Sequence, residues 1–268
     1  MAGWSEKVLD IDLNTLTHRT YPLDMEIARL FIGGRGLGAR LLWDMVGPEV
    51  DPLSPENVLI FTNGPLTGTG YQTSNRFSVT TKSPLTGTIL DANSGGFWGM
   101  QFKKTGYDVM IVRGKSETPV WIEIKNGEVA FHDAGELWGM RVFALTEKLG
   151  QNNNKRNVLC IGPAGENLSR IAAIMNDRER ALARGGPGAV MGSKNLKAIV
   201  VEGRQRPEIM DQEQFKFLLY EARKSLAQSP LTSQALPEFG TVVLMNIMNT
   251  VGALATRNHQ QTQFEGAE

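Results

Sequence analysis

Apolar segments of strand length, separated by polar turns, run through most of the chain. Residues 8–13 alternate apolar and polar positions, which is typical of a half-buried strand. Similar segments, rich in β-branched or aromatic residues, follow at 58–61, 77–81, 109–112, 120–124, 158–161 and 198–202. The Asn126-Gly127 pair predicts a hairpin that leads into a further strand at 129–131.

Helical periodicity is confined to fewer segments. Helices are expected at 24–31, where Asp24 can act as the N-cap, at 37–46 and at 140–149. Later in the chain, Asp211 and Gln214 resemble a capping box that opens an amphipathic helix. A further apolar segment at 242–254 is also compatible with a helix.

The change of pattern near Gly203-Arg204-Gln205-Arg206-Pro207 predicts a domain boundary. We therefore expect an α+β domain over residues 1–207 and the beginning of an α-rich domain over 208–268. The last residues, from Arg257 onward, are polar and contain no closing element. The second domain is accordingly expected to be incomplete.

Net charge and cysteine content exclude several classes of protein. Lys and Arg together number 28 and Asp and Glu also number 28, so a general nucleic-acid or membrane-surface binder is not expected. A lone cysteine, Cys160, excludes a disulfide framework and any self-contained iron–sulfur or Cys-rich zinc site. No segment resembles a signal peptide or a membrane span, and a cytoplasmic location is expected.

Glycine is concentrated in five short islands, each beside Asn, Ser, Thr or Arg. Glycine permits positive φ and lets a ligand approach backbone N–H groups, and consecutive N–H groups can form anion sites. The islands therefore suggest a surface that holds a large phosphate-bearing molecule. They lie at residues 33–38, 64–70, 93–96, 162–167 and 184–188.

Two features leave alternatives open. Pro65-Leu66-Thr67-Gly68-Thr69 recurs as Pro84-Leu85-Thr86-Gly87-Thr88, and Val58…Gly64-Pro65 has a looser echo in Val158…Gly162-Pro163. These echoes indicate either a pseudo-symmetric base for a ligand with two similar halves or ordinary turn chemistry. The arginines at 178, 180 and 184, which precede a Gly-Gly turn, suit phosphate binding or a solvated charged face.

Side chains for metal binding or proton transfer are scarce. His18, His132 and His259 are scattered and have no metal-ligand spacing. Cys160 lies inside an apolar strand segment and is expected to be a buried structural thiol. No nucleophile and base can be paired. The chain thus offers residues that hold a cofactor, without an evident proton-transfer residue.

Several motifs, taken together and in this order, resemble the tungsten-containing aldehyde:ferredoxin oxidoreductases. The likeness extends from the N-terminus to about Gly252. The motifs are Gly64-Pro65-Leu66-Thr67-Gly68, Lys82-Ser83-Pro84-Leu85-Thr86-Gly87, Ala92-Asn93-Ser94-Gly95-Gly96, Gly106-Tyr107-Asp108, Ile161-Gly162-Pro163-Ala164-Gly165-Glu166-Asn167, Ala173-Ile174-Met175-Asn176-Asp177 and Gly188-Ala189-Val190-Met191-Gly192-Ser193-Lys194-Asn195-Leu196-Lys197-Ala198.

The resemblance implies a fold, a cofactor and a set of binding residues. The fold would be α+β, with two pseudo-two-fold-related β-sheets that cradle a tungsten (or molybdenum) bis-pyranopterin with no protein ligand to the metal. Arg76 would lie between a pterin and a [4Fe-4S] cluster, and the backbone carbonyls of Asn93 and Ala181 would hold a magnesium that bridges the pterin phosphates. The remaining residues expected at the cofactor are Ser94, Gly95, Gly96, Arg180, Arg184, Gly185 and Gly186.

The cysteines that bind the cluster in this family lie beyond the region of resemblance. The chain is therefore expected to be the N-terminal part of an enzyme that oxidises aldehydes and reduces ferredoxin, and to lack turnover alone. Expected partners are ferredoxin and the remaining domains, or a subunit with the cluster cysteines. A homo-oligomer is compatible with this reading. A non-catalytic pterin-binding module or relic, and another reaction such as aromatic acyl-CoA reduction, remain as alternatives.

Overall fold

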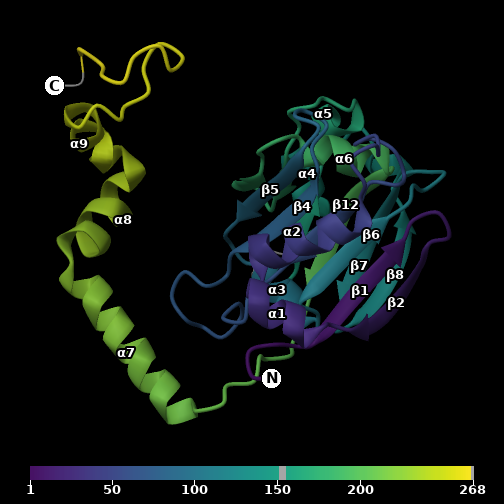
Figure 1. The fold of residues 1–268 in the computed structure, drawn as a ribbon, viewed down its shortest axis with the longest axis horizontal. Helices are drawn as coiled ribbons and strands as arrows, with labels where there is room; N and C mark the ends of the chain where they lie inside the picture. Colours follow the sequence, from purple (N-terminus) through teal and green to yellow (C-terminus); the bar gives the residue numbers. More distant parts are fainter. Residues whose placement is uncertain (151–154, 267–268) are drawn as a thin grey trace. The chain divides into compact units, whose positions relative to one another are not determined.

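The chain divides into two compact units, Met1–Met210 and Asp211–Glu268 (Figure 1). The computed structural model describes residues 1–150 and 155–266. Among these residues, no helix combines the length and the apolar character that crossing a membrane would require.

The first sheet of the N-terminal unit has six strands in the order β2-β1-β6-β3-β4-β5. Strands β1 and β6 are parallel, and all other neighbours are antiparallel. Strands β3 and β4 are buried along their whole length, although only β3 is mostly apolar, and β4 also buries Ser78, Thr80, Thr81 and Lys82. The bounds are β1 Lys7–Asp12, β2 Thr17–Pro22, β3 Leu59–Thr62, β4 Phe77–Lys82, β5 Ile89–Ser94 and β6 Val109–Arg113.

The second sheet repeats the topology of the first. Its order is β11-β10-β9-β12-β7-β8, and again only one pair, β7 with β12, is parallel. Strands β7 to β12 therefore occupy the same positions, in the same chain order, as β1 to β6. This confirms the expected α+β fold of two related sheets. The bounds are β7 Val120–Lys125, β8 Glu128–Asp133, β9 Asn157–Cys160, β10 Ile174–Asn176, β11 Arg180–Leu182 and β12 Leu196–Glu202.

The two sequence repeats lie at different kinds of position in the fold. The segments 65–69 and 84–88 are the β3–β4 loop and the β4–β5 turn of the same sheet, so their similarity does not mark the duplication. The looser echo is the informative one. Val58…Gly64-Pro65 and Val158…Gly162-Pro163 span β3 and β9, which are equivalent strands of the two sheets.

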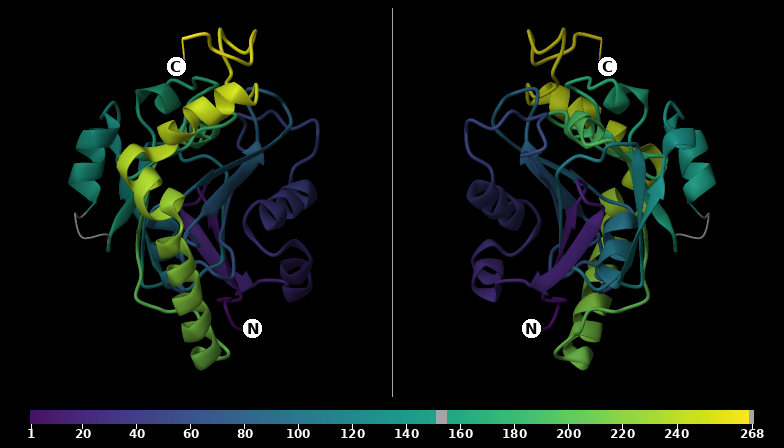
Figure 2. Two further views of the ribbon diagram at one scale, coloured as in Figure 1. Left: turned by 90° about the vertical axis from the view of Figure 1, so that its left-hand side faces the viewer. Right: turned by 90° about the vertical axis from the view of Figure 1, so that its right-hand side faces the viewer.

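Helices cover the outer faces of both sheets and also fill the space between them (Figures 1 and 2). Helices α1 (Met25–Phe31) and α2 (Gly34–Met45) pack on the outer face of the first sheet, and α4 (Val142–Leu149) packs on the second. Between the sheets lie α3 (Trp98–Lys104) and α6 (Pro187–Ser193). Two short helices, η1 (Gly135–Leu137) and α5 (Pro163–Glu166), complete the unit.

Both inner helices contact the opposite half, and α6 also packs against β12 and β10 of its own sheet. Helix α3 follows β5 of the first half, yet it packs against β12 and β9 of the second sheet. Its Trp98 side chain is fully buried and donates Nε1–H to the carbonyl of Ile199, 3.2 Å away. Helix α6 of the second half packs in turn against β3 and β4 of the first sheet. The halves are thus interlocked through one shared core.

The C-terminal unit is helical. Asp211 caps its first helix, α7 (Gln212–Gln228), by accepting a hydrogen bond from the Gln214 backbone N–H at 2.8 Å. The expected helix over 242–254 is present only up to Thr250. In the described part of this unit, residues 211–266, the helices bury no residue. The remaining elements are η2 Leu231–Ala235, α8 Leu236–Phe239, η3 Gly240–Leu244 and α9 Met245–Thr250.

Candidate functional site

A cleft of about 720 Å³ opens where β3 ends and β4 begins. Glycines, apolar side chains and a few polar groups line it together, a composition that is typical of ligand sites. Two of the predicted site residues, Arg76 and Asn93, are part of its wall. The lining residues are Ile32, Gly33, Gly34, Arg35, Gly64, Pro65, Leu66, Thr67, Tyr71, Gln72, Thr73, Ser74, Arg76, Ser78 and Asn93.

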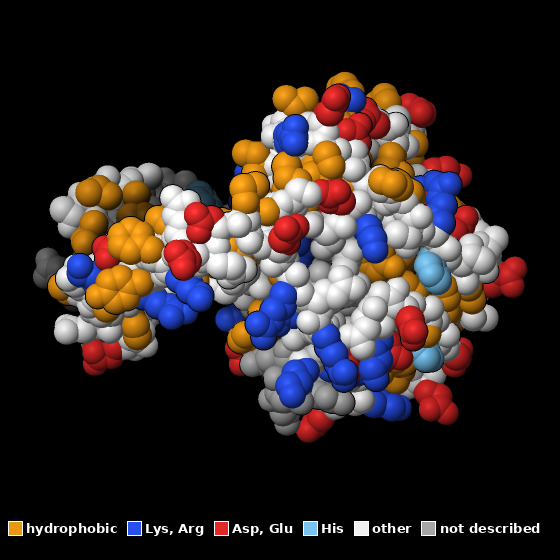
Figure 3. Space-filling view, turned by 90° about the horizontal axis from the view of Figure 1, so that it is seen from below, with side chains coloured by type: hydrophobic (Ala, Val, Ile, Leu, Met, Phe, Trp, Pro, Cys, Tyr) orange, Lys and Arg blue, Asp and Glu red, His pale blue; other side chains and the backbone are white. Residues whose placement is uncertain are grey.

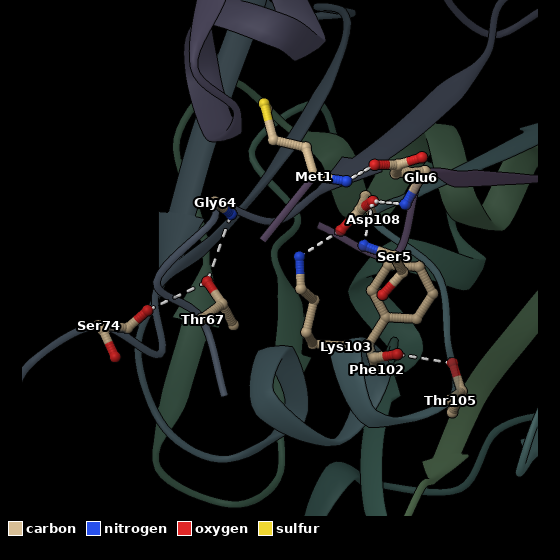
Figure 4. A network of polar contacts seen from close by, with 10 residues as sticks. All are labelled: Met1, Ser5, Glu6, Gly64, Thr67, Ser74, Phe102, Lys103, Thr105 and Asp108. Atoms are coloured by element: carbon tan, nitrogen blue, oxygen red, sulfur yellow. Dashed lines mark hydrogen bonds and ion pairs between the residues drawn. The ribbon is translucent and has the colours of Figure 1, made fainter. Parts of the chain in front are cut away.

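The β3–β4 loop forms one wall of the cleft and holds its own shape (Figure 4). The Thr67 hydroxyl accepts a hydrogen bond from the Gly64 backbone N–H at 3.3 Å and donates to the Ser74 carbonyl at 3.1 Å. The Gly68 N–H donates to the Asn75 side chain at 3.3 Å, and Gly68 takes a φ of +81°. The second glycine island is therefore an ordered loop at the ligand cleft.

Arg76 is held in place by Asn93. Arg76 directly precedes β4, and its guanidinium Nη1 donates to the side-chain oxygen of Asn93 on the neighbouring strand β5. Both residues are exposed at the cleft. The predicted pair thus lies together on rigid strands, with a positive charge available to a ligand.

The N-terminus of α2 also faces the cleft, a feature that sequence reasoning missed. The helix was expected from residue 37, but it begins at Gly34. A Cβ on Gly33 would lie 2.5 Å from the Asn63 carbonyl oxygen, and Gly33 has a φ of +124°, so only glycine fits. No side chain caps this helix. Its N-terminal dipole therefore adds positive potential at the cleft wall.

The Gly95-Gly96 turn lies where the two halves of the unit meet. Asn176 of β10 donates its amide N–H to the Ser94 hydroxyl at 3.0 Å and to the Gly95 carbonyl at 2.7 Å. A Cβ on Gly96 would lie 3.1 Å from Cδ of Arg180. The structure thus brings together four of the predicted site residues, Ser94, Gly95, Gly96 and Arg180.

The Gly185-Gly186 turn is the equivalent feature of the second half. It follows β11 and precedes α6, as Gly95-Gly96 follows β5 and precedes α3. A Cβ on Gly185 would lie 2.3 Å from the Leu90 side chain, and one on Gly186 would lie 2.1 Å from the Arg170 carbonyl oxygen. The obstacle at Gly186 is backbone, so packing requires glycine there, whereas at Gly185 it is the flexible end of the Leu90 side chain.

The fourth glycine island serves helix packing. A Cβ on Gly165 of α5 would lie 2.9 Å from the carbonyl oxygen of Gly188 in α6, and one on Gly192 of α6 would lie 2.0 Å from the carbonyl oxygen of Gly165. All three glycines are buried. The adjacent Glu166 forms a buried ion pair with Lys197. This island accordingly lets α5 and α6 approach closely, which explains its glycines without an anion.

The arginine run is largely solvated. Arg178 and Arg180 are 39% and 51% exposed, and each lies about 4 Å from a glutamate. Arg184 is also exposed. The surface shown in Figure 3 carries side chains of both signs, with Lys and Arg gathered in one area. The exposure of these arginines leaves their expected role in phosphate binding a prediction.

Protein side chains offer no metal cage in the described residues. Within 1–150 and 155–266, no three His, Cys, Asp or Glu side chains are grouped to bind a metal ion. Burial raises the pKa of the Cys160 thiol to about 11, so this residue is an inert structural thiol, as expected. His132 lies beside Glu123 and stacks on Trp121, which gives it a structural role.

Comparison with known proteins identifies the family of the chain. A model of the aldehyde ferredoxin oxidoreductase N-terminal domain matches residues 8–203, and a model of domains 2 and 3 of the same enzymes matches residues 218–268. The chain belongs to the aldehyde ferredoxin oxidoreductase family. This family is tungsten-containing, which implies a tungsten pterin cofactor. The Arg76 guanidinium and the uncapped N-terminus of α2 at the cleft suit an anionic group of this kind.

Individual family members extend the match over the whole chain. Tungsten-containing aldehyde ferredoxin oxidoreductases from Pyrococcus abyssi and Thermococcus kodakarensis are 45% and 46% identical over 100% of this chain. The chain spans 44% of the length of either relative. A solved active-site complex, BamBC of benzoyl coenzyme A reductase, aligns with a TM-score of 0.79 and 38% identity. That alignment covers 84% of this chain and 35% of the solved one.

Proposed function

We propose that this chain is the cofactor-binding base of an enzyme that oxidises aldehydes to carboxylic acids and passes the electrons to ferredoxin. The observation that carries the proposal is the pair of glycine turns, Gly95-Gly96 and Gly185-Gly186, at equivalent positions of two related sheets. Paired turns suit a cofactor with two similar phosphate-bearing halves. Identity of 45–46% to aldehyde-oxidising relatives, against 38% to the acyl-CoA reductase complex, favours aldehydes as substrates.

The chain would bind and orient a tungsten (or molybdenum) bis-pyranopterin. When bound, this group supplies the two-electron chemistry by which oxygen from water is added to the aldehyde carbon. Arg76, held by Asn93, would place its guanidinium beside one pterin, on the side of the [4Fe-4S] cluster. The protein would thus contribute position and electrostatic potential.

Phosphate binding would use backbone groups and arginines of both halves. The carbonyls of Asn93 on β5 and Ala181 on β11 would hold a magnesium ion that bridges the two phosphates. The edge strands β5 and β11 are in contact, which supports this arrangement. The N–H groups and side chains at the two turns would bind the phosphates and pterins directly, through Ser94, Gly95, Gly96, Arg180, Arg184, Gly185 and Gly186.

Electron transfer would need residues outside this chain. A [4Fe-4S] cluster requires several cysteine ligands, and the chain has one cysteine, Cys160, which is buried and has a raised pKa. The cluster would be bound by the remaining domains or by a partner subunit, and ferredoxin would accept the electrons. The isolated 268-residue chain should therefore not reduce a viologen dye with aldehyde.

Metal and pterin analysis of natively purified holoprotein tests the proposal. In the complete enzyme, which includes the domains or subunit that bind the cluster, we expect about one tungsten or molybdenum and two pterins per copy of this chain, together with aldehyde-dependent viologen reduction. Arg76→Ala should lower the pterin content, because it removes a cation at the cleft wall. Arg178→Ala is the matched control, since Arg178 is an arginine of the solvated run and lies outside the cleft.

Two results would contradict the proposal. Folded protein that contains neither metal nor pterin would favour a non-catalytic relic. Equal pterin content in Arg76→Ala and Arg178→Ala would show that the cleft lined by Arg76 does not bind the pterin. Aldehyde oxidation by the isolated chain would contradict the assignment of electron transfer to residues outside it.

A further inference from the structure

The glycine turn of each half is hydrogen-bonded by a side chain of the other half. Asn176 of the second half donates to the Gly95 carbonyl at 2.7 Å, across 81 residues of chain. Ser83 of the first half donates its hydroxyl to the Gly185 carbonyl at 2.7 Å, across 102 residues. The two contacts are reciprocal, because Gly95 and Gly185 are equivalent residues of the repeated topology.

The backbone conformations of the two turns match at the second glycine and differ at the first, because Gly185 has a φ of +74° and Gly95 has no positive φ. In each turn the second glycine has positive φ, +85° at Gly96 and +83° at Gly186. The donors occupy matching places as well: Asn176 is the last residue of β10, and Ser83 directly follows the last residue of β4. Because β4 and β10 are equivalent strands, the sequence has placed different donors at nearly the same point of both halves.

Packing repeats this reciprocity. Gly96 lies against the side chain of Arg180 on β11, and Gly185 lies against the side chain of Leu90 on β5. Each turn therefore rests on the edge strand of the opposite half. Leu90 and Ser94 are four residues apart on β5, so the turns are separated by roughly 13 Å along this strand.

Both donors are buried, so their hydrogen bonds are hard to replace. Ser83 and Asn176 are each 1% exposed. The glycines that accept these bonds, Gly95 and Gly185, are half-buried, so removal of either donor would leave a partly shielded carbonyl without its protein partner. The side-chain oxygen of Asn176 has no hydrogen-bond partner in the described structure. The Asn176 amide therefore contributes through its NH2 group, which donates to Ser94 and Gly95.

We propose that Asn176 and Ser83 are reciprocal positioning residues that couple the two glycine turns, so that the two halves of the cofactor are bound as one unit. This inference rests on the proposed function. Movement of one turn displaces a residue that holds the other, because each donor belongs to a strand next to its own half's turn. Loss of either bond therefore weakens both binding turns together.

The test compares cofactor retention in holoprotein variants. Ser83→Ala, Asn176→Ala and the double variant are purified with cofactor, and pterin and tungsten release is followed during dilution. Ser54→Ala and Asn167→Ala serve as controls, since each removes one side-chain bond to a local backbone carbonyl. Ser83→Ala and Asn176→Ala should each release both pterins about ten-fold faster than wild type. The double variant should be no faster than the worse single variant.

Several outcomes would overturn the coupling. If the single variants melt at lower temperature but retain the cofactor as wild type does, the two hydrogen bonds stabilise the fold and do not couple the turns. Effects that multiply in the double variant would show two independent turns. Ser83→Thr keeps the hydroxyl and should restore wild-type retention. If Ser83→Ala or Asn176→Ala does not fold, the same release measurement is made on Ser83→Cys or Asn176→Asp.

Failure of the proposed function gives a different result. Wild-type holoprotein without pterin or metal would overturn the proposed function and the coupling with it. If wild-type holoprotein contains the cofactor and the Ser83 and Asn176 variants all release it at the wild-type rate, the coupling would be overturned and the proposed function would stand.

Discussion

Substitution of the positive-φ glycines by alanine gives a quantitative test of why glycine occurs at the turns. Gly186 has a φ of +83°, and an added Cβ would lie 2.1 Å from the Arg170 carbonyl oxygen. Gly87 is a matched control, because its φ is +71° and nothing lies within 4 Å of the same position. The two sites share the conformational cost of alanine and differ in steric cost.

The expected losses of folding free energy follow from these two terms. Alanine at positive φ costs about 1–2 kcal/mol at either site. Overpacking adds about 1–3 kcal/mol at Gly186 alone, since a backbone carbonyl cannot rotate away. Gly186→Ala should therefore lower the free energy of unfolding by about 2–5 kcal/mol and Gly87→Ala by about 1–2 kcal/mol. Gly185→Ala should fall between them, because its obstacle is the flexible end of Leu90, 2.3 Å away.

Urea unfolding followed by tryptophan fluorescence measures these losses. Trp98 is fully buried between the sheets, so its emission reports on the core of the N-terminal unit. In a Leu90→Ala background, Gly185→Ala should cost only the conformational term of about 1–2 kcal/mol. Equal losses for Gly186→Ala and Gly87→Ala would refute the steric reasoning, as would an unchanged cost of Gly185→Ala without the Leu90 side chain.

Three further predictions concern buried ionisable groups. Asp108 and Lys103 form an ion pair with 0% exposure, so Asp108→Asn should lower the free energy of unfolding by about 3–5 kcal/mol in the same urea assay; a loss below 1 kcal/mol would contradict this. With its pKa raised to about 11 by burial, Cys160 should resist thiol reagents at pH 8 until urea unfolds the chain, and rapid labelling of native protein would argue against its burial. Burial lowers the pKa of Lys194 to about 8, against an ordinary value of 10.5, so the unfolded chain binds more protons between these pH values and stability should rise with pH there. A flat stability profile from pH 8 to 10.5 in wild type, or the same rise in Lys194→Met, would contradict this assignment.

Much of the fold follows from local pattern. Long apolar strands such as β12 bury nearly every residue, so their composition alone identifies them. Helix starts at Asp24 and Asp211 were found because capping depends on residues two or three positions apart. The edge strand β2 was missed, since its sequence THRTYP is mostly exposed and lacks an apolar face. Strands β10 and β11 were missed because they have three residues each.

The candidate site was less predictable than the fold. Glycine content located the turns, but composition does not separate a glycine required by a neighbouring helix, as at Gly165, from one at a ligand cleft, as at Gly64. The positioning roles of Ser83 and Asn176 depend on contacts between residues 81 or more positions apart. Only the three-dimensional arrangement of the two halves reveals such contacts.

The repeated strand order has an evolutionary consequence. Two equal halves that embrace one another, each holding the other's turn, have the geometry of an isologous homodimer. A short connector, 114–119, now joins what such a dimer would have kept as separate polypeptides. Within a single chain the two halves are free to differ in sequence, and their donors do differ, a hydroxyl at Ser83 on one side and an amide at Asn176 on the other.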